Sequence, residues 1–382
     1  MSQLVSAAEI LRELVAIPTP SAVSNLPLLR WVEAFLEPRG WRVLLLPYRD
    51  QQGVEKANLV ARPDEERIDL AFVCHTDTVP YDANWPGALA LQERDGQLHG
   101  CGSCDVKGSL ACFLAAVSSL EPDAIAKGVG LILTADEEIG CKGMEQLLAK
   151  DEFRHIRIGS AIVSEPTSLR PGVAGKGYGL AQITVEGREA HSAFPRQGVS
   201  AISVAARLIG QIEDSVDSGG AANDLLFDPP RTTLNIGVIE GGTAKNIIPG
   251  RCTFLVEWRA VPGESPDRML RLLRALVEEA QRVAPQAVIK LEGLRVEAGF
   301  APAPRGSLQL RLASLLPGEP TGISFGSEAS RVARIADEVI VIGPGDMRSA
   351  HSDRECVPVA ELEEWTAALS SLLRTGLLQT SQ

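Results

Sequence analysis

The sequence predicts an α/β protein with a parallel-rich sheet covered by helices, and a second unit inserted into it. Apolar runs at 69–75, 128–134 and 160–165 indicate buried strands, because they are short, β-branched and bounded by turn-forming residues. Helical patterns alternate with these runs, which is typical of parallel strands whose crossover helices cover both sheet faces. At 382 residues the chain is long for one core, so we expect two domains.

The first part of the chain supplies most of that sheet. Helices are expected at 6–16, 25–38, 108–120 and 143–150, and strands at 41–47, 57–62, 69–75, 128–134 and 160–165. The turn Pro18-Thr-Pro-Ser21 separates the first two helices. Asp95-Gly96 is a strong two-residue turn signal and predicts a hairpin within 88–99.

The order of elements changes after the glycine-rich joint at 175–179. Strands are expected at 180–186, 232–239, 251–260 and 287–295, and helices at 198–213 and 265–283. This βαββαβ order predicts a ferredoxin-like unit. A helix at 307–315, a polar connector at 322–330, a strand at 338–342 and a helix at 359–374 then resume the first pattern. We therefore expect a discontinuous domain, 1–175 with 297–382, and an inserted lid domain, 176–296.

Composition narrows the classes of function. The net charge of −12 argues against a nucleic-acid partner. No apolar run approaches the roughly 20 residues of a membrane helix, and the first ten residues do not resemble a signal peptide. Seven irregularly spaced cysteines indicate reduced thiols, so we expect a cytoplasmic protein. Cys101 and Cys104 form a lone C-x-x-C that we interpret as incidental, because no second pair completes a zinc ribbon.

Side chains that can bind metal lie at or just after the carboxyl ends of three of the predicted buried strands. They are His75, the pair Glu137 and Glu138, and Glu165. Ligands of open α/β sheets bind at the carboxyl ends of the strands, so these groups are expected to converge. Asp77 projects to the same side as His75, because strand side chains alternate between faces.

Two further candidates complete a ligand set. Asp105 lies in a loop that opens a helix, and His351 follows the glycine-rich segment Gly343-Pro-Gly-Asp346. One metal needs three or four protein ligands, so five candidates and a spare glutamate fit two metals that share a carboxylate. Nitrogen and oxygen ligands suit zinc or cobalt better than magnesium. The spare acid of the Glu137–Glu138 pair is then free to act as a base.

Five ordered segments resemble the motifs of the dinuclear zinc amidohydrolases and exopeptidases. The segments are Cys74-His-Thr-Asp-Thr-Val-Pro80, Ser103-Cys-Asp-Val-Lys-Gly108, Ala135-Asp-Glu-Glu138, Ser164-Glu-Pro-Thr167 and Ser349-Ala-His351. This family includes acetylornithine deacetylase, succinyl-diaminopimelate desuccinylase, aminoacylase and carboxypeptidase G. Chain length, Ser327-Glu-Ala329 and Gly343-Pro-Gly-Asp346 are most similar to its acetylornithine deacetylases. Cys74 and Glu257-Trp258 depart from the family pattern.

The resemblance implies a zinc-exopeptidase-like fold with two Zn²⁺ per subunit, for which Co²⁺ can substitute. It implies that Asp105 bridges the metals, and that Asp77 orients His75. One site is completed by His75 and Glu165, and the other by Glu138 and His351. Glu137 is implied as the general base, and then as the acid that protonates the leaving amine.

The inserted unit is implied to contribute substrate contacts and a homodimer interface. The resemblance places His191, in Glu189-Ala-His191, as an oxyanion donor to the other subunit's site. Asn246 and Arg259 are implied to hold substrate oxygens and carboxylate. Glu328 is a candidate partner for a substrate ammonium. Simpler interpretations stay open: a polar strand-end residue for His191, a surface ion pair for Arg259, and a helix-capping acid for Glu328.

The expected activity is hydrolysis of the amide of an N-acyl amino acid, with N2-acetyl-L-ornithine preferred, as in arginine biosynthesis. N-acetylcitrulline and N-succinyl-diaminopimelate are the alternative substrates. A metal-binding protein without activity is the alternative of a different class. We expect a small-molecule substrate, and neither nucleic acid nor membrane as a partner.

Overall fold

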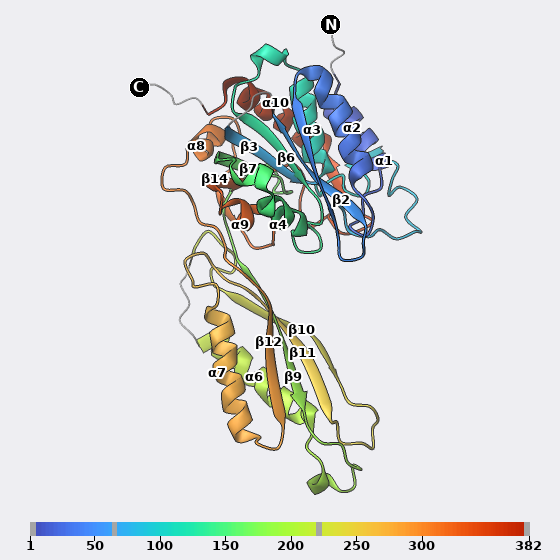
Figure 1. The fold of residues 1–382 in the computed structure, drawn as a ribbon, viewed down its shortest axis with the longest axis vertical. Helices are drawn as coiled ribbons and strands as arrows, with labels where there is room; N and C mark the ends of the chain where they lie inside the picture. The colour runs from blue at the N-terminus through green and yellow to red at the C-terminus, as the bar shows by residue number, and fades with distance from the viewer. Residues whose placement is uncertain (1–4, 63–66, 219–223, 378–382) are drawn as a thin grey trace. The chain divides into compact units, whose positions relative to one another are not determined.

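The computed structural model describes residues 5–62, 67–218 and 224–377. Contacts divide the chain into two compact units (Figure 1). The first unit comprises Met1–Val173, Pro302–Thr321 and Ser327–Gln382, and the second comprises Ala174–Ala301 and Gly322–Gly326. Among the helices that the structure describes, none has the length and apolar character needed to cross a bilayer.

The larger sheet has eight strands in the order β1-β2-β6-β3-β7-β14-β8-β13. Their bounds are Arg42–Arg49 (β1), Glu55–Arg62 (β2), Ile68–His75 (β3), Val129–Thr134 (β6), Ile158–Val163 (β7), Gly172–Gly175 (β8), Thr321–Ile323 (β13) and Ala336–Val341 (β14). The central strands β6, β3, β7 and β14 pair in parallel. The pairs β1–β2, β2–β6 and β14–β8 are antiparallel, so the sheet is mixed. The predicted parallel-rich α/β class is confirmed.

Helices of the first unit pack on this sheet and on one another. Their bounds are Ala7–Ala16 (α1), Leu26–Leu36 (α2), Lys107–Ser118 (α3), Lys142–Ala149 (α4), Asp151–Arg154 (α5), Ser307–Ala313 (α8), Ala329–Val332 (α9) and Val359–Thr375 (α10). Helix α1 begins with a capping box between Ser6 and Glu9. Every residue of α3 is buried, since α1 and α10 both pack against it.

A small antiparallel sheet contains the predicted hairpin. Its strands are Gln92–Arg94 (β4), Gln97–His99 (β5) and Cys356–Pro358 (β15), in the order β15-β5-β4. The turn residues Asp95 and Gly96 have φ of 51° and 73°. Positive φ at both positions matches a type I′ turn, which is the conformation that Asp-Gly favours between antiparallel strands.

The second unit is the predicted βαββαβ fold. Its elements are Tyr178–Glu186 (β9), Ala201–Ser218 (α6), Thr233–Gly241 (β10), Arg251–Arg259 (β11), Arg268–Val283 (α7) and Val288–Glu297 (β12). The strands form an antiparallel sheet in the order β10-β11-β9-β12. Helices α6 and α7 pack on one face of it (Figure 1). Leu208, Phe254 and Leu273 lie in the fully buried core between helices and sheet.

The structure differs from the expected elements where the segments are short. The connector at 322–330 contains the end of β13 and the start of α9, and its Glu328 is buried although the segment looked polar. Strands and helices of three or four residues carry too little periodicity to be recognised in a sequence. All seven cysteines carry free thiols, and those of Cys101 and Cys104 are buried.

Candidate metal centre

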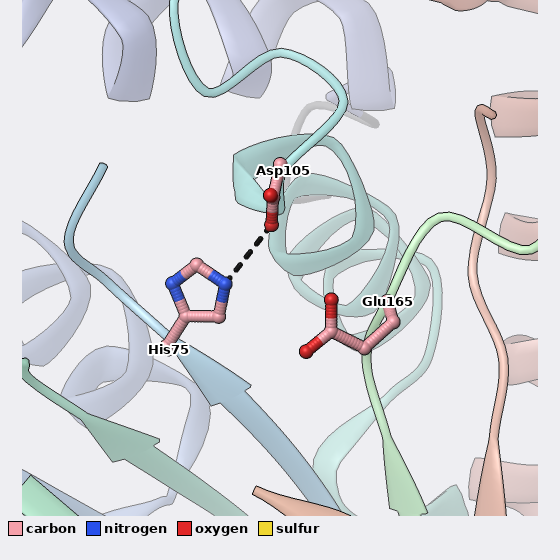
Figure 2. A group of neighbouring side chains, drawn as sticks. All are labelled: His75, Asp105 and Glu165. Carbon is pink, nitrogen blue, oxygen red and sulfur yellow. Dashed lines mark hydrogen bonds and ion pairs between the residues drawn. The ribbon is translucent and has the colours of Figure 1, made fainter. Parts of the chain in front are cut away.

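His75 is the last residue of β3, and it is buried between the neighbouring strands β6 and β7. Its Nδ1 lies 3.0 Å from the backbone oxygen of Asp77. A bond there assigns the proton to Nδ1, which leaves Nε2 to face the site. That nitrogen lies 3.0 Å from Oδ1 of Asp105 (Figure 2). Glu165, which follows β7, points toward the same space (Figure 2).

Asp105 lies in the loop before α3, and a buried glutamate fixes that loop. The Glu355 carboxylate accepts backbone hydrogen bonds from Gly102, Cys104 and Asp105, each at 3.0 Å. Three amide donors to one carboxylate define the path of the backbone, and therefore the place of the Asp105 side chain. Glu355 was not among the predicted site residues, although it lies only four positions after His351.

Two groups of potential ligands share Asp105. His75, Asp105 and Glu165 form a buried group, and Asp105, Glu138 and His351 form a more exposed one. Within each group the ligand atoms lie within 4.8 Å of one another. Asp105 uses Oδ1 toward His75 and Oδ2 toward His351, whose Nε2 is 3.1 Å away. A carboxylate that presents separate oxygens to two groups fits a bridge between two cations.

The electrostatics of this cluster favour bound cations. Burial, with the neighbouring Asp105 carboxylate, raises the pKa of Glu165 well above its usual value. Hydrogen bonds to Asp105 and then Glu138 raise the pKa of His351 to about 10. His351 therefore carries a proton at neutral pH when no metal is bound. A bound cation would replace that proton, because only the deprotonated group is a ligand.

Glu137 belongs to neither ligand group, although it directly precedes Glu138. Burial raises its pKa to about 8, and the carboxylates of Glu138, Glu328 and Asp77 contribute to the shift. Its backbone amide donates to Oδ1 of Asp77 at 3.0 Å. A carboxyl group that lies outside both ligand groups and has a pKa near neutrality suits proton transfer.

Asp77 contacts more than the histidine that it was expected to orient. Its Oδ1 lies 3.6 Å from Nδ1 of His75, longer than the backbone contact to the same nitrogen. Its Oδ2 accepts hydrogen bonds from Ser21 Oγ at 2.7 Å and from the Glu138 amide at 3.3 Å. Asp77 therefore joins the end of β3 to the turn that carries both glutamates.

Three predicted substrate contacts lie in the second unit. His191 is exposed, and its Nδ1 accepts a hydrogen bond from the Ala193 amide at 3.1 Å. His191 forms an antiparallel bridge with Ile247, so the segment that carries Asn246 lies beside the segment that carries His191. Arg259 ends β11, where its Nε pairs with Glu257 at 2.8 Å.

Glu328 lies in the first unit, with 1% of its surface exposed. Its Oε1 accepts a hydrogen bond from Thr134 Oγ1 at 2.6 Å, and its buried Oε2 has no hydrogen-bond partner. Burial raises its pKa to about 7. The side chain makes no capping hydrogen bond to α9. The interpretation of Glu328 as a helix cap therefore has no support in these contacts.

Comparison with known proteins places the chain in a family. Residues 173–285 match the peptidase dimerisation domain of the M20 family. The acetylornithine deacetylase of Myxococcus xanthus is 41% identical over 371 residues, which cover 94% of this chain and 94% of that protein. The chain belongs to the M20 family. The acetylornithine deacetylase of Pasteurella multocida (strain Pm70) is 28% identical and covers 98% of both chains.

Solved M20 structures share the fold over nearly the whole chain. A metallo-carboxypeptidase of the M20 family from Sulfolobus solfataricus has a TM-score of 0.72 at 16% identity, covering 97% of this chain and 99% of that one. A dinuclear metal-binding M20 peptidase from Bacillus subtilis has a TM-score of 0.66 at 15% identity, covering 97% and 96%. The family resemblance of the five motifs is thus confirmed, and with it the predicted fold.

Proposed function

We propose that this M20 enzyme hydrolyses the amide of N2-acetyl-L-ornithine to ornithine and acetate, the reaction expected for arginine biosynthesis. The observation that carries the proposal is the Asp105 carboxylate shared by two ligand groups, with Glu137 beside them but in neither. The relatives named acetylornithine deacetylase support the choice of substrate.

The metals of the proposal are two Zn²⁺ per chain, with Co²⁺ as a substitute. His75 and Glu165 would hold one, Glu138 and His351 the other, and Asp105 both. This donor set of two imidazoles and three carboxylates suits zinc or cobalt. When bound, the cations supply Lewis acidity, which polarises the scissile carbonyl and lowers the pKa of the attacking water.

Glu137 transfers the proton in this proposal. Its carboxylate takes a proton from the attacking water and later gives it to the departing amine, so the residue ends the cycle unchanged. Burial raises its pKa to about 8 in the metal-free chain, toward the range that suits a group that both takes and gives a proton. The backbone amide of Glu137 donates a hydrogen bond to Asp77, which fixes the position from which the Glu137 side chain extends. His191 would donate to the oxyanion that forms between these two proton transfers.

Substrate selection uses three further groups. Arg259 carries a planar guanidinium suited to the α-carboxylate, and Asn246 offers an amide to substrate oxygens. Glu328 supplies a buried carboxylate with an unpartnered oxygen, which suits the side-chain ammonium of ornithine. N-acetylcitrulline and N-succinyl-diaminopimelate remain the alternative substrates, and neither presents a lone ammonium in that position.

The active form in this proposal is a cytoplasmic homodimer, in which the two chains contact each other through their inserted domains, 176–296. The match of 173–285 to a peptidase dimerisation domain supports this assembly. The outer strand β10 carries exposed apolar residues, Val238 and Ile239, at 46% and 53% exposure. An edge strand of this kind can pair with its symmetry mate.

A substrate panel tests the proposal. Zinc-loaded enzyme is incubated with acetylornithine, acetylcitrulline and succinyl-diaminopimelate, and the released amine is quantified for each. The highest kcat/KM is expected for acetylornithine. A preference for either other substrate would replace the proposed one, and zinc-loaded protein that releases no amine would support the inactive alternative.

A further inference from the structure

A buried ion pair lies beside the turn that carries Glu137. Nζ of Lys56, in β2, lies 2.5 Å from Oδ1 of Asp136, and their side chains are 1% and 0% exposed. Neither residue belongs to the ligand groups. A buried ion pair is weak evidence for stability, because desolvation of both charges offsets their attraction. The contacts of this pair indicate that it fixes the position of the neighbouring turn.

The contacts of Lys56 form a closed path around the turn. Its ammonium donates both to Asp136 and to the backbone oxygen of Ser21. The hydroxyl of Ser21 donates to Asp77 at 2.7 Å, and Asp77 accepts the amide of Glu137 at 3.0 Å. Lys56 thus supports Glu137 from two directions, through the preceding residue and through the carboxylate that binds its amide.

The backbone at Asp136 explains why the turn needs such support. Its φ is 57°, in the left-handed region that non-glycine residues rarely adopt. Its carboxylate accepts a second hydrogen bond, from Tyr48 Oη at 2.8 Å, and its carbonyl accepts from the Lys142 amide at 3.0 Å. Held in this conformation, Asp136 sets the direction in which the chain leaves for Glu137 and Glu138.

We propose that Lys56 and Asp136 are positioning residues for the reaction, and that their ion pair aims the Glu137–Glu138 turn at the metal centre. The inference rests on the proposed function in taking Glu137 as the group that transfers the proton. Neither residue of the pair touches the reacting atoms. A misplacement of about 1 Å can cost roughly 10² in rate, so the position of this turn bears directly on turnover.

The test compares Lys56→Met with the double variant Lys56→Met/Asp136→Asn. Lys56→Met removes the ammonium group but keeps an apolar side chain of similar length. The double variant also replaces the Asp136 carboxylate, which would otherwise be buried without its cationic partner. We expect both to lose about 10-fold or more in kcat at saturating zinc, with little change in KM, since a mispositioned proton-transfer group affects the chemical step. Compared with Lys56→Met, the double variant should be more stable to heat but should have an equally low kcat. If the ion pair were merely structural, kcat would recover together with stability.

A second measurement does not depend on activity. Hydrogen exchange of the peptide covering 135–141 is followed in metal-free protein, and both variants should exchange faster there than wild type. Lys150→Met is the matched control, because it removes the same charge from a surface lysine whose Nζ contacts the Pro47 carbonyl at 3.0 Å. This control should leave kcat and exchange unchanged. If Lys56→Met does not fold, Tyr48→Phe removes one hydrogen bond from Asp136, and kcat should fall about 5-fold.

The outcomes separate this inference from the proposed function. The positioning role would be overturned if the double variant had the kcat and the exchange rate of the wild type. If Lys56→Met does not fold, the same result in Tyr48→Phe would overturn it. Wild-type enzyme that cleaves no acyl amino acid would instead overturn the proposed function, and the exchange measurement would still decide whether Lys56 orders the turn.

Discussion

One carboxylate oxygen of Asp77 accepts the backbone amide of Glu137 at 3.0 Å, although the two residues are 60 positions apart in the chain. The contact follows from the sheet, because β3 and β6 are parallel neighbours and His75 lies in register with Thr134. The residues that follow these strands therefore meet at one edge. This relationship joins the end of the strand that carries His75 to the proposed general base, so a change at either affects the other.

The two ligand groups predict two cations per chain. Elemental analysis of zinc-loaded protein should give two zinc ions, and chelation should abolish turnover until zinc or cobalt is restored. Glu165→Ala should lower the content toward one, because that residue lies in a single group. Asp105→Ala should weaken both sites. Full activity in protein verified to be metal-free would contradict the proposed metal dependence.

Replacement of the two adjacent glutamates should give different results. Glu137→Gln keeps the shape of the side chain but removes proton transfer, so kcat should fall by about 10²–10⁴ with zinc content unchanged. Glu138→Gln should reduce zinc content, because Glu138 lies 3.1 Å from His351 in a ligand group. Parallel kinetics and metal analysis make the comparison. If Glu137→Gln loses zinc while its turnover per bound zinc survives, the two roles are reversed.

Metal binding should release protons at neutral pH. Hydrogen bonds to Asp105 and Glu138 raise the pKa of His351 to about 10, so this residue holds a proton at pH 7 in metal-free protein. The pKa values of His75 and Glu165 are also raised well above their usual values. Cation binding requires their deprotonated forms, and affinity should therefore fall as pH is lowered. Calorimetry at pH 7 in buffers of different ionisation enthalpy should report proton release, of at least about one proton from His351.

The variant His351→Ala provides the control for that experiment. It removes one of the protonated ligands, so the second site should bind more weakly and proton release should drop by about one. Zinc binding at pH 7 without any release of protons would show that these groups do not carry protons in the metal-free state.

Glu328 should discriminate between substrates by charge. Glu328→Gln should reduce kcat/KM for acetylornithine by about 10- to 100-fold, the range expected for loss of a hydrogen bond to a charged group. Acetylcitrulline, whose ureido group is neutral, should be affected far less. Thermal stability should not decrease, because the variant removes a buried carboxylate whose Oε2 has no partner. Equal losses on the two substrates would exclude recognition of the ammonium by Glu328.

His191 should act on the site of the other subunit. Inactive His191→Ala chains are mixed with inactive Glu137→Gln chains under conditions that allow subunit exchange. A heterodimer then contains one site with both wild-type residues, supplied by different chains, and activity should return. In the His191→Ala homodimer, kcat should fall by about 10²–10³ with zinc retained, as for loss of an oxyanion donor. Heterodimers confirmed by mass that stay inactive would rule out the shared site.

The sequence by itself determined the elements and the candidate ligands. His75 and Glu165 follow apolar runs whose length and β-branched character indicate buried strands, and strand ends are where α/β sheets bind ligands. The βαββαβ order of the second unit is also a local property, because each element has its own period and its own turn signals.

Only the tertiary structure decided how these groups act together. The two oxygens of Asp105 face different histidines, His75 and His351, and Glu355 fixes the Asp105 loop from about 250 positions away. Lys56 lies outside the strand expected at 57–62 and belongs to none of the recognised motifs, yet it is buried against Asp136, 80 positions away. Side-chain contacts over such separations depend on strand order and register, and no local pattern of residues encodes them.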